Sequence, residues 1–203
     1  MIQSSEFERR RSPRQLREFV EGLKETVRSD DVERHLGILK RGLYKQFLEE
    51  LVPLSCFAVL VYPDNYGVQA VLGNQGYDAL VFDEVGREVD RVELTAPHDG
   101  RAAAQNDALV VGRGFGKVTV GNPGDDFDAR VKHVLTTCRN KAQKDYGDST
   151  LVVTIEPLSP FAGFEDRYDR QVASLVDQMS KIDFNSKRTF LLILPDRLEA
   201  VHA

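Results

Sequence analysis

Two acidic residues stand in segments whose apolar pattern predicts β-strands. Asp78 lies near the start of YDALVFD (77–83), and Glu93 lies inside EVDRVELT (88–95). A strand points successive side chains to opposite faces, so Glu93 shares one face with Thr95. Carboxylates brought together on paired strands suit metal-dependent hydrolysis. These acids are therefore the first candidates for chemistry.

The pairing register of the two strands decides whether the acids meet. Between them, EVGR contains Gly86, which can supply a turn, so the short spacing predicts an antiparallel hairpin. In one register Asp78 lies opposite Glu93 or Thr95, and all three project from the same side of the sheet. A register shifted by one residue separates them. The sequence leaves both registers open.

Two carboxylates held close together in a partly buried place need a cation between them, because burial and like charge both disfavour ionisation. Mg²⁺ or Mn²⁺ supplies that charge, and it uses one or two protein carboxylates together with water and phosphate oxygens. Such a site activates water for phosphodiester hydrolysis. The structural alternative is that Asp78 caps a strand start and that Glu93 pairs with Arg91 or another base.

Helices are expected before these strands. SPRQ (12–15) has the form of a capping box with proline at the first helical position, and apolar residues recur at helical spacing as far as Val27. Asp30 signals the start of a second helix, which Pro53 is expected to close. The run FAVLVYP (57–63) is apolar but its pattern does not decide between helix and strand.

The remaining segments alternate between strands and helices. The expected elements are a strand at 67–73, the hairpin, a short helix at 100–111, a strand at 116–122, a helix from Asp125 or Asp126 to Gly147, a strand at 150–157, a helix from Tyr168 to Ile182 and a strand at 189–195. Strand-helix-strand units favour parallel neighbours. The sequence therefore predicts an α/β protein with a mixed sheet flanked by helices.

The segment GNQGYDALVFDEVGREVDRVELT, with a helix before it and a helix and strand after it, resembles the core of the PD-(D/E)XK nuclease-like superfamily. The resemblance covers about residues 31–156 and implies a restriction-endonuclease-like αβββαβ core. Asp78 matches the first acid of the motif and Glu93 matches the acid of its triplet. The single domain would then comprise an N-terminal basic helix (1–28), this core and a C-terminal helix-strand extension (157–203).

The motif's lysine is replaced here by Thr95. The resemblance implies that this lysine orients the attacking water and stabilises negative charge. It also implies that members without the lysine take a cation from a neighbouring element or have lost activity. Lys141 is our candidate for the replacement cation, with Lys132 and Lys144 on less favourable helix faces. A solvated helix lysine is the alternative reading of each.

Polar residues that follow the hairpin extend the set of candidates. His98 and Asp99 come soon after Glu93, and Gln105 and Asp107 lie on the next expected helix. The histidine and its neighbour could reach a metal, and the helix residues could add polar contacts. A polar turn or a solvated helix surface explains the same residues without a function.

Three functions follow as hypotheses. The first is a divalent-metal-dependent nuclease acting on DNA phosphodiesters, with Asp78 and Glu93 holding Mg²⁺ or Mn²⁺, Thr95 hydrogen-bonding the water or a phosphate, and Lys141 as the replacement cation. The second is a catalytically silent nuclease-fold module that binds nucleic acid or protein. The third is a structural subunit, or a homo-oligomer, that docks through its N-terminal helix.

Composition narrows the wider choices. The chain has 203 residues and a formal net charge of -5, which argues against nucleic-acid binding by bulk electrostatics, although arginines concentrate between residues 7 and 17. Two cysteines form no CxxC pair, four histidines match no zinc spacing, and VGRGFGKVTV lacks the GK[ST] ending of a P-loop. With no export signal or membrane-length apolar run, we expect a cytoplasmic protein that does not act at a membrane.

Overall fold

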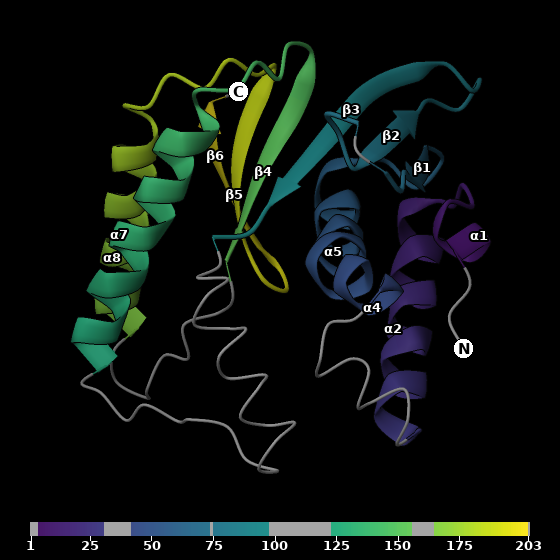
Figure 1. Ribbon diagram of the computed structural model, residues 1–203, viewed down its shortest axis with the longest axis horizontal. Helices are drawn as coiled ribbons and strands as arrows, with labels where there is room; N and C mark the ends of the chain where they lie inside the picture. The colour runs from purple at the N-terminus through teal and green to yellow at the C-terminus, as the bar shows by residue number, and fades with distance from the viewer. Residues whose placement is uncertain (1–3, 31–41, 74, 98–122, 156–164, 203) are drawn as a thin grey trace.

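The computed structural model describes residues 4–30, 42–73, 75–97, 123–155 and 165–202 (Figure 1). The helical elements are α1 (Ser4–Phe7), α2 (Pro13–Ser29), α4 (Leu43–Gln46), the π-helical turn η1 (Phe47–Leu51), α5 (Val52–Val61), α7 (Pro123–Lys141) and α8 (Glu165–Met179). The strands are β1 (Gly67–Ala70), β2 (Ala79–Phe82), β3 (Glu88–Thr95), β4 (Ser149–Ile155), β5 (Arg188–Ile193) and β6 (Arg197–His202). The helix expected at 100–111 and the strand expected at 116–122 lie outside the described residues.

The six strands form one open sheet in the order β1-β2-β3-β4-β5-β6. β1, β2 and β3 are antiparallel neighbours, β3, β4 and β5 are parallel, and β6 returns antiparallel to β5. The predicted α/β architecture with a mixed sheet is confirmed. β6 was not predicted, although the Pro195-Asp196 pair that precedes it is a turn signal.

Helices cover both faces of the sheet, as Figure 1 shows, with α2, α4 and α5 on one side and α7 and α8 on the other. We call these the α5 face and the α7 face. Val92, Leu94 and Val152 belong to the core of the α5 face, whereas Leu151 and Val153 pack with α7 and α8. Both cores consist of buried apolar side chains, whose removal from water is the main stabilising contribution.

The start of α2 agrees with the prediction. Ser12 caps the helix, its hydroxyl accepting a hydrogen bond from Gln15 N at 3.3 Å, while Gln15 Oε1 accepts one from Ser12 N at 3.1 Å. Pro13 occupies the first helical position. The short-range sequence signal therefore places this helix correctly.

The expected helix end at Pro53 is wrong. α4, η1 and α5 follow one another without a break from Leu43 to Val61, so FAVLVYP (57–63) is mostly helical. The π-helical turn directly before Pro53 changes the hydrogen-bond spacing, as in the bond from Val52 N to Phe47 O. An altered ladder accommodates a residue that has no N–H and whose ring crowds the preceding turn. Pro53 is buried inside the continued helix.

The end of α7 also differs from the prediction. The helix stops at Lys141 rather than at Gly147, and a turn closes with Lys144 N donating to Lys141 O at 2.9 Å. Gly147 does adopt a left-handed φ of 51°, but in the following loop, where its N–H donates to Asp145 Oδ1 at 2.9 Å. The glycine belongs to an Asp-centred turn before β4 instead of a helix cap.

A buried carboxylate joins α5 to the middle of the sheet. Asp90 on β3 is 4% exposed; it accepts hydrogen bonds from Tyr62 Oη at 2.7 Å and from Thr150 Oγ1 at 2.9 Å. Arg188 on β5 pairs with the same carboxylate, and Lys187 Nζ lies 3.5 Å from its other oxygen. We call these five residues the Asp90 network. Every strand from β3 to β5 contributes to it, so it stabilises the parallel part of the sheet.

None of the helices in the described ranges has the length and apolar content needed to cross a bilayer.

Candidate acidic site at the end of the β2–β3 hairpin

The hairpin register brings the two predicted acids together. Ala79 lies opposite Val92 and Leu80 opposite Arg91, and the paired ladder ends there, so Asp78 directly precedes β2 at the end of the hairpin that carries Glu93. The backbone N–H of Asp78 donates to Val92 O at 2.8 Å. Of the two registers that the sequence allows, the structure has the one that brings the acids together.

The carboxylate of Asp78 is held by the neighbouring strand. Its Oδ2 accepts a hydrogen bond from Leu94 N at 2.7 Å, in the place of the backbone carbonyl that a regular ladder would use. Burial raises the pKa of Asp78 to about 6, the bond from Leu94 opposes that rise, and the charge of Glu93 adds to it. The side chain is thus fixed in position and partly protonated near neutral pH.

Lys141 contacts the second acid. The last residue of α7 reaches β3, and its Nζ lies 3.1 Å from Glu93 Oε1. The Glu93 side chain is 13% exposed and that of Lys141 is 22% exposed, so the pair is shielded from bulk water. Val134, Leu135 and Cys138 anchor α7 on the sheet and so direct its C-terminal end towards Glu93.

A third acid, Glu50 on η1, belongs to the same electrostatic group. Its pKa is raised to about 7 by burial first, then by the charges of Asp78, Glu49 and Glu93, with Lys45 opposing. Sequence reasoning missed this residue. The available signal was a glutamate next to the inward stripe residue Leu51 in an amphipathic helix, a position where a charge is costly.

Tyr146, in the loop between α7 and β4, is a further residue that sequence reasoning missed. Its side chain is 8% exposed and packs in the α7-face core with Leu151, the residue directly opposite Glu93 on β4. Its hydroxyl has no hydrogen-bond partner among the described residues. Burial and the charges of Glu93 and Asp78 raise the pKa of this phenol, so it remains a hydrogen-bond donor.

Of the other candidates from the sequence, some lie among the described residues and some lie outside them. Thr95 is buried at the end of β3, opposite Val153, and its carbonyl accepts from Thr154 Oγ1 at 3.4 Å. Lys132 and Lys144 are exposed, and of these lysines Lys141 is the one that pairs with an acid of the site. His98, Asp99, Gln105 and Asp107 lie outside the described residues.

The oxygen donors fit a hard divalent cation in kind. Asp78, directly before β2, and Glu93 on β3 are both carboxylates, and burial, followed by the charges of neighbouring acids, raises the pKa values of Asp78 and Glu50. The described residues contain no preassembled group of three or more metal-ligating side chains. A cation here would therefore use the two strand acids with water or phosphate oxygens, as Mg²⁺ commonly does.

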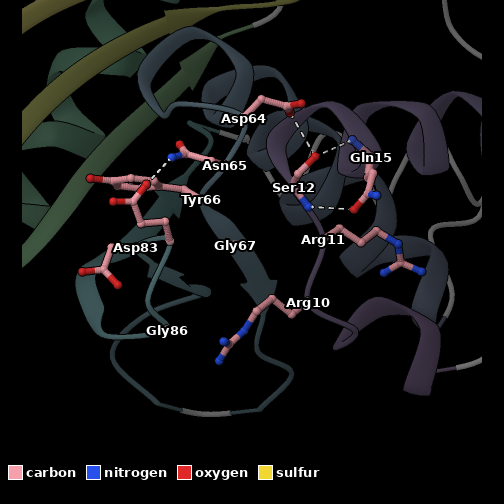
Figure 2. A pocket seen from close by; sticks show the side chains of 11 residues that line it. Arg10, Arg11, Ser12, Gln15, Asp64, Asn65, Tyr66, Gly67, Asp83 and Gly86 are labelled. Atoms are coloured by element: carbon pink, nitrogen blue, oxygen red, sulfur yellow. Dashed lines mark hydrogen bonds between the residues drawn. The ribbon is translucent and has the colours of Figure 1, made fainter.

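A shallow polar pocket of about 330 Å³ lies at the opposite end of the hairpin (Figure 2). Its polar groups largely satisfy one another, since Ser12 Oγ donates to Asp64 Oδ1 at 2.9 Å and Asn65 Nδ2 donates to Glu84 Oε2 at 2.6 Å. The pocket is lined by the start of α2 and by the β2–β3 turn, so it is separate from the acidic site. We therefore interpret the pocket as a packing contact between the N-terminal segment and the hairpin turn.

Comparison of the chain with models of protein families, with curated proteins and with solved structures finds no match in any of the three.

Proposed function

We propose that the protein is a divalent-metal-dependent nuclease of the PD-(D/E)XK type, acting on DNA phosphodiesters. The observation that carries the proposal is that Asp78, held by Leu94 N next to Glu93, interacts electrostatically with Glu93, with Lys141 Nζ 3.1 Å from Glu93. The order α5, β1, β2, β3, α7, β4, with β3 and β4 parallel, supports a restriction-endonuclease-like core. Lys141 then takes the role that Thr95 cannot fill.

Asp78 and Glu93 are the residues that would hold Mg²⁺ or Mn²⁺, and the bound ion would supply Lewis-acid activation of water. Lys141 places an ammonium group beside Glu93, where it can hold a water molecule or a phosphate oxygen and offset developing negative charge. Glu50, with a pKa near 7, is suited to accept a proton at neutral pH. Thr95 would contribute a hydroxyl to water or phosphate.

A catalytically silent module is the second candidate. The ion pair between Lys141 and Glu93 gives Glu93 a counter-charge without any metal, and Thr95 stands where the motif has a lysine. The same arrangement would then serve as a structural link between α7 and β3. Metal binding separates the two candidates.

The test is calorimetric titration of the wild type, Asp78→Asn and Glu93→Gln with Mg²⁺ and Mn²⁺. We expect one weak-to-moderate site in the wild type and a loss of affinity of at least about tenfold in each variant, since each removes a charged ligand. Asp177→Asn removes one exposed carboxylate that pairs with Lys181 and serves as the matched control. Equal affinity in wild type and both site variants would reject the metal site.

Cleavage assays distinguish an active nuclease from a catalytically silent module that binds metal. With a labelled single-stranded or double-stranded DNA and Mn²⁺, the nuclease hypothesis predicts activity that Asp78→Asn abolishes. Lys141→Met should lower the rate by about 100-fold while leaving metal binding within a few-fold, because the lysine acts on water and phosphate rather than on the ion. Metal binding with no cleavage of either DNA would favour the silent module.

A further inference from the structure

Arg10 differs from every other arginine in the N-terminal basic stretch. The other four have a carboxylate within 4.0 Å; these pairs are Arg9–Glu6, Arg11–Glu6, Arg14–Asp64 and Arg17–Glu21. The guanidinium of Arg10 instead lies over the ring of Phe82, 3.4 Å from its centroid. No carboxylate lies within ion-pair distance of Arg10 in the described parts of the chain, although the residue is exposed. Its charge is therefore available to a ligand.

Gly67 on β1 makes room for this arginine. A Cβ atom at Gly67 would lie 2.7 Å from Arg10 Cδ and 2.9 Å from Cγ, which is closer than such contacts allow. Figure 2 shows Arg10 beside Gly67 at the edge of the pocket. Because the missing side chain lets Arg10 lie flat on the strand, its guanidinium plane is held against Phe82 rather than moving freely in solvent.

The strand register puts Arg10 on the same side of the sheet as the acidic site. Phe82 and Leu80 alternate with the buried Ala79 and Val81, so they lie on the α7 face. Leu80 lies opposite Arg91, which shares its face with Glu93 two residues further along β3. We call the surface formed by Leu80, Phe82, Arg91 and Glu93 together with Arg10 the arginine face.

A second arginine on this face also lies over an aromatic ring. The guanidinium of Arg91 lies 5.4 Å from the Tyr77 ring centroid, and its side chain is 47% exposed. Its ion pair with Glu88, at 2.7 Å, is a surface pair whose net contribution is small, so phosphate can replace the carboxylate at little cost. Glu93 and Arg91 are two residues apart on β3, and Leu80, which lies opposite Arg91, is two residues from Phe82 on β2. Each of these two separations along a strand is about 7 Å.

A guanidinium laid against a ring keeps its N–H edge free, and that edge matches the two oxygens of a phosphate. We propose that the arginine face binds the backbone of a DNA strand, with Arg10 and Arg91 each holding one phosphate and the strand continuing to Glu93. The net charge of -5 makes general attraction of DNA unfavourable, so binding must depend on these local contacts. The assignment of DNA rests on the proposed function, whereas the binding needs neither metal nor cleavage.

The test measures binding of a labelled single-stranded oligonucleotide by fluorescence anisotropy in EDTA. We expect Arg10→Gln and Arg91→Gln each to raise Kd about five- to tenfold. Each should also lower the slope of log affinity against log salt by about 0.7, the value for one lost phosphate contact to a single strand. The matched control is Arg28→Gln, which removes the same charge from an exposed residue at the far end of α2.

Gly67→Ala keeps every charge but displaces Arg10 from Phe82, so it should weaken binding in the same direction as Arg10→Gln. Equal effects of Arg10→Gln and Arg28→Gln, or a wild type that binds no DNA, would overturn the proposal. So would equal binding of poly-glutamate with the same dependence on Arg10, since that would indicate a surface for acidic protein segments.

Failure of the surface and failure of the nuclease hypothesis give different results. If DNA binding in EDTA depends on Arg10 but Asp78→Asn leaves metal binding unchanged, the results support the arginine face as a DNA-binding surface and reject the metal site. If metal binding and cleavage depend on Asp78 while Arg10→Gln binds DNA like Arg28→Gln, the results support the metal site and reject the arginine face as a DNA-binding surface.

Discussion

The hydroxyl of Tyr146 is buried without a hydrogen-bond partner among the described residues, next to two carboxylates. An unsatisfied buried hydroxyl costs roughly 1–3 kcal/mol of stability, and phenylalanine would fill the same space without that cost. Under the proposed function, this phenol is suited to donate a hydrogen bond to a phosphate oxygen of the DNA.

We expect Tyr146→Phe to unfold in urea at the same or a higher midpoint than the wild type. Its cleavage rate should fall about 10- to 100-fold with unchanged Mn²⁺ affinity, the loss expected for one hydrogen bond to a charged group. The comparison is Tyr168→Phe on α8, which changes a partly buried phenol that packs against the same α7-face core. A Tyr146→Phe variant that is less stable by more than about 1 kcal/mol and cleaves normally would assign the hydroxyl to folding.

Among the elements, the strands β3, β4 and β5 are joined by the Asp90 network. Asp90 accepts hydrogen bonds from Tyr62 and Thr150 and pairs with two basic residues of β5 and the turn before it. Breaking a buried pair is costly because the remaining charge keeps its desolvation penalty without its partner.

Asp90→Asn should lower the free energy of unfolding by about 3 kcal/mol, measured by urea denaturation. The exposed pair of Asp177 and Lys181 provides the contrast, because Asp177→Asn should change that free energy by no more than about 0.5 kcal/mol. Since Asp90 lies on the α5 face and Glu93 on the α7 face, metal affinity of the folded Asp90→Asn protein should stay close to that of the wild type. A change of less than about 1 kcal/mol in stability would show that the Asp90 carboxylate contributes little to holding β3, β4 and β5 together.

Sequence patterns predicted those elements whose signals are local. The capping box at 12–15, the strand at 88–95 and the buried run of β4 all appear where alternation or helical spacing put them. The errors arise where tertiary packing overrides a local rule. Pro53 reads as a helix end, but a π-helical turn accommodates it inside a buried helix.

Some residues of the candidate site could likewise be predicted from the sequence, and others could not. Asp78 and Glu93 were visible as acids in strand patterns, and Lys141 was visible as a cation near an inward helix stripe. Glu50 and Tyr146 were not, because each comes to the acids through packing of a separate element and neither matches a motif. Sequence also left the hairpin register open, since both faces of β3 carry charged residues.

At the scale of the whole molecule, the acidic site links stability to pH. Burial raises the pKa of Glu50 to about 7 and that of Asp78 to about 6, above their ordinary values of 4.5 and 3.8. Groups with a raised pKa in the folded state contribute stability that is fully present below the ordinary pKa. That contribution is lost as pH rises through the folded values, because the folded state then binds more protons than the unfolded state.

In EDTA, we therefore expect the contribution of the site to Tm to fall between about pH 4 and pH 8. Glu50→Gln should flatten that fall and raise Tm relative to the wild type above about pH 7, whereas Glu25→Gln, at an exposed pair on α2, should not. Mn²⁺ should restore stability most strongly at the alkaline end, because the ion binds the deprotonated carboxylates. Identical pH profiles for wild type and Glu50→Gln would contradict the raised pKa of Glu50.

Under the proposed function, the sequence separations in the mixed sheet lead us to expect that the two acids come together before the lysine joins them during folding. Asp78 and Glu93 meet in a local hairpin, whereas Lys141 reaches Glu93 only with α7 docked, 48 residues along the chain. Closing a short hairpin loop is faster than forming a long-range parallel crossover. A nascent chain would thus gather its two acids before their lysine, and an ion captured at that stage would meet no cation able to activate attack on DNA. Under the proposed function, we therefore expect activity to require the completed fold, with α7 docked on the sheet.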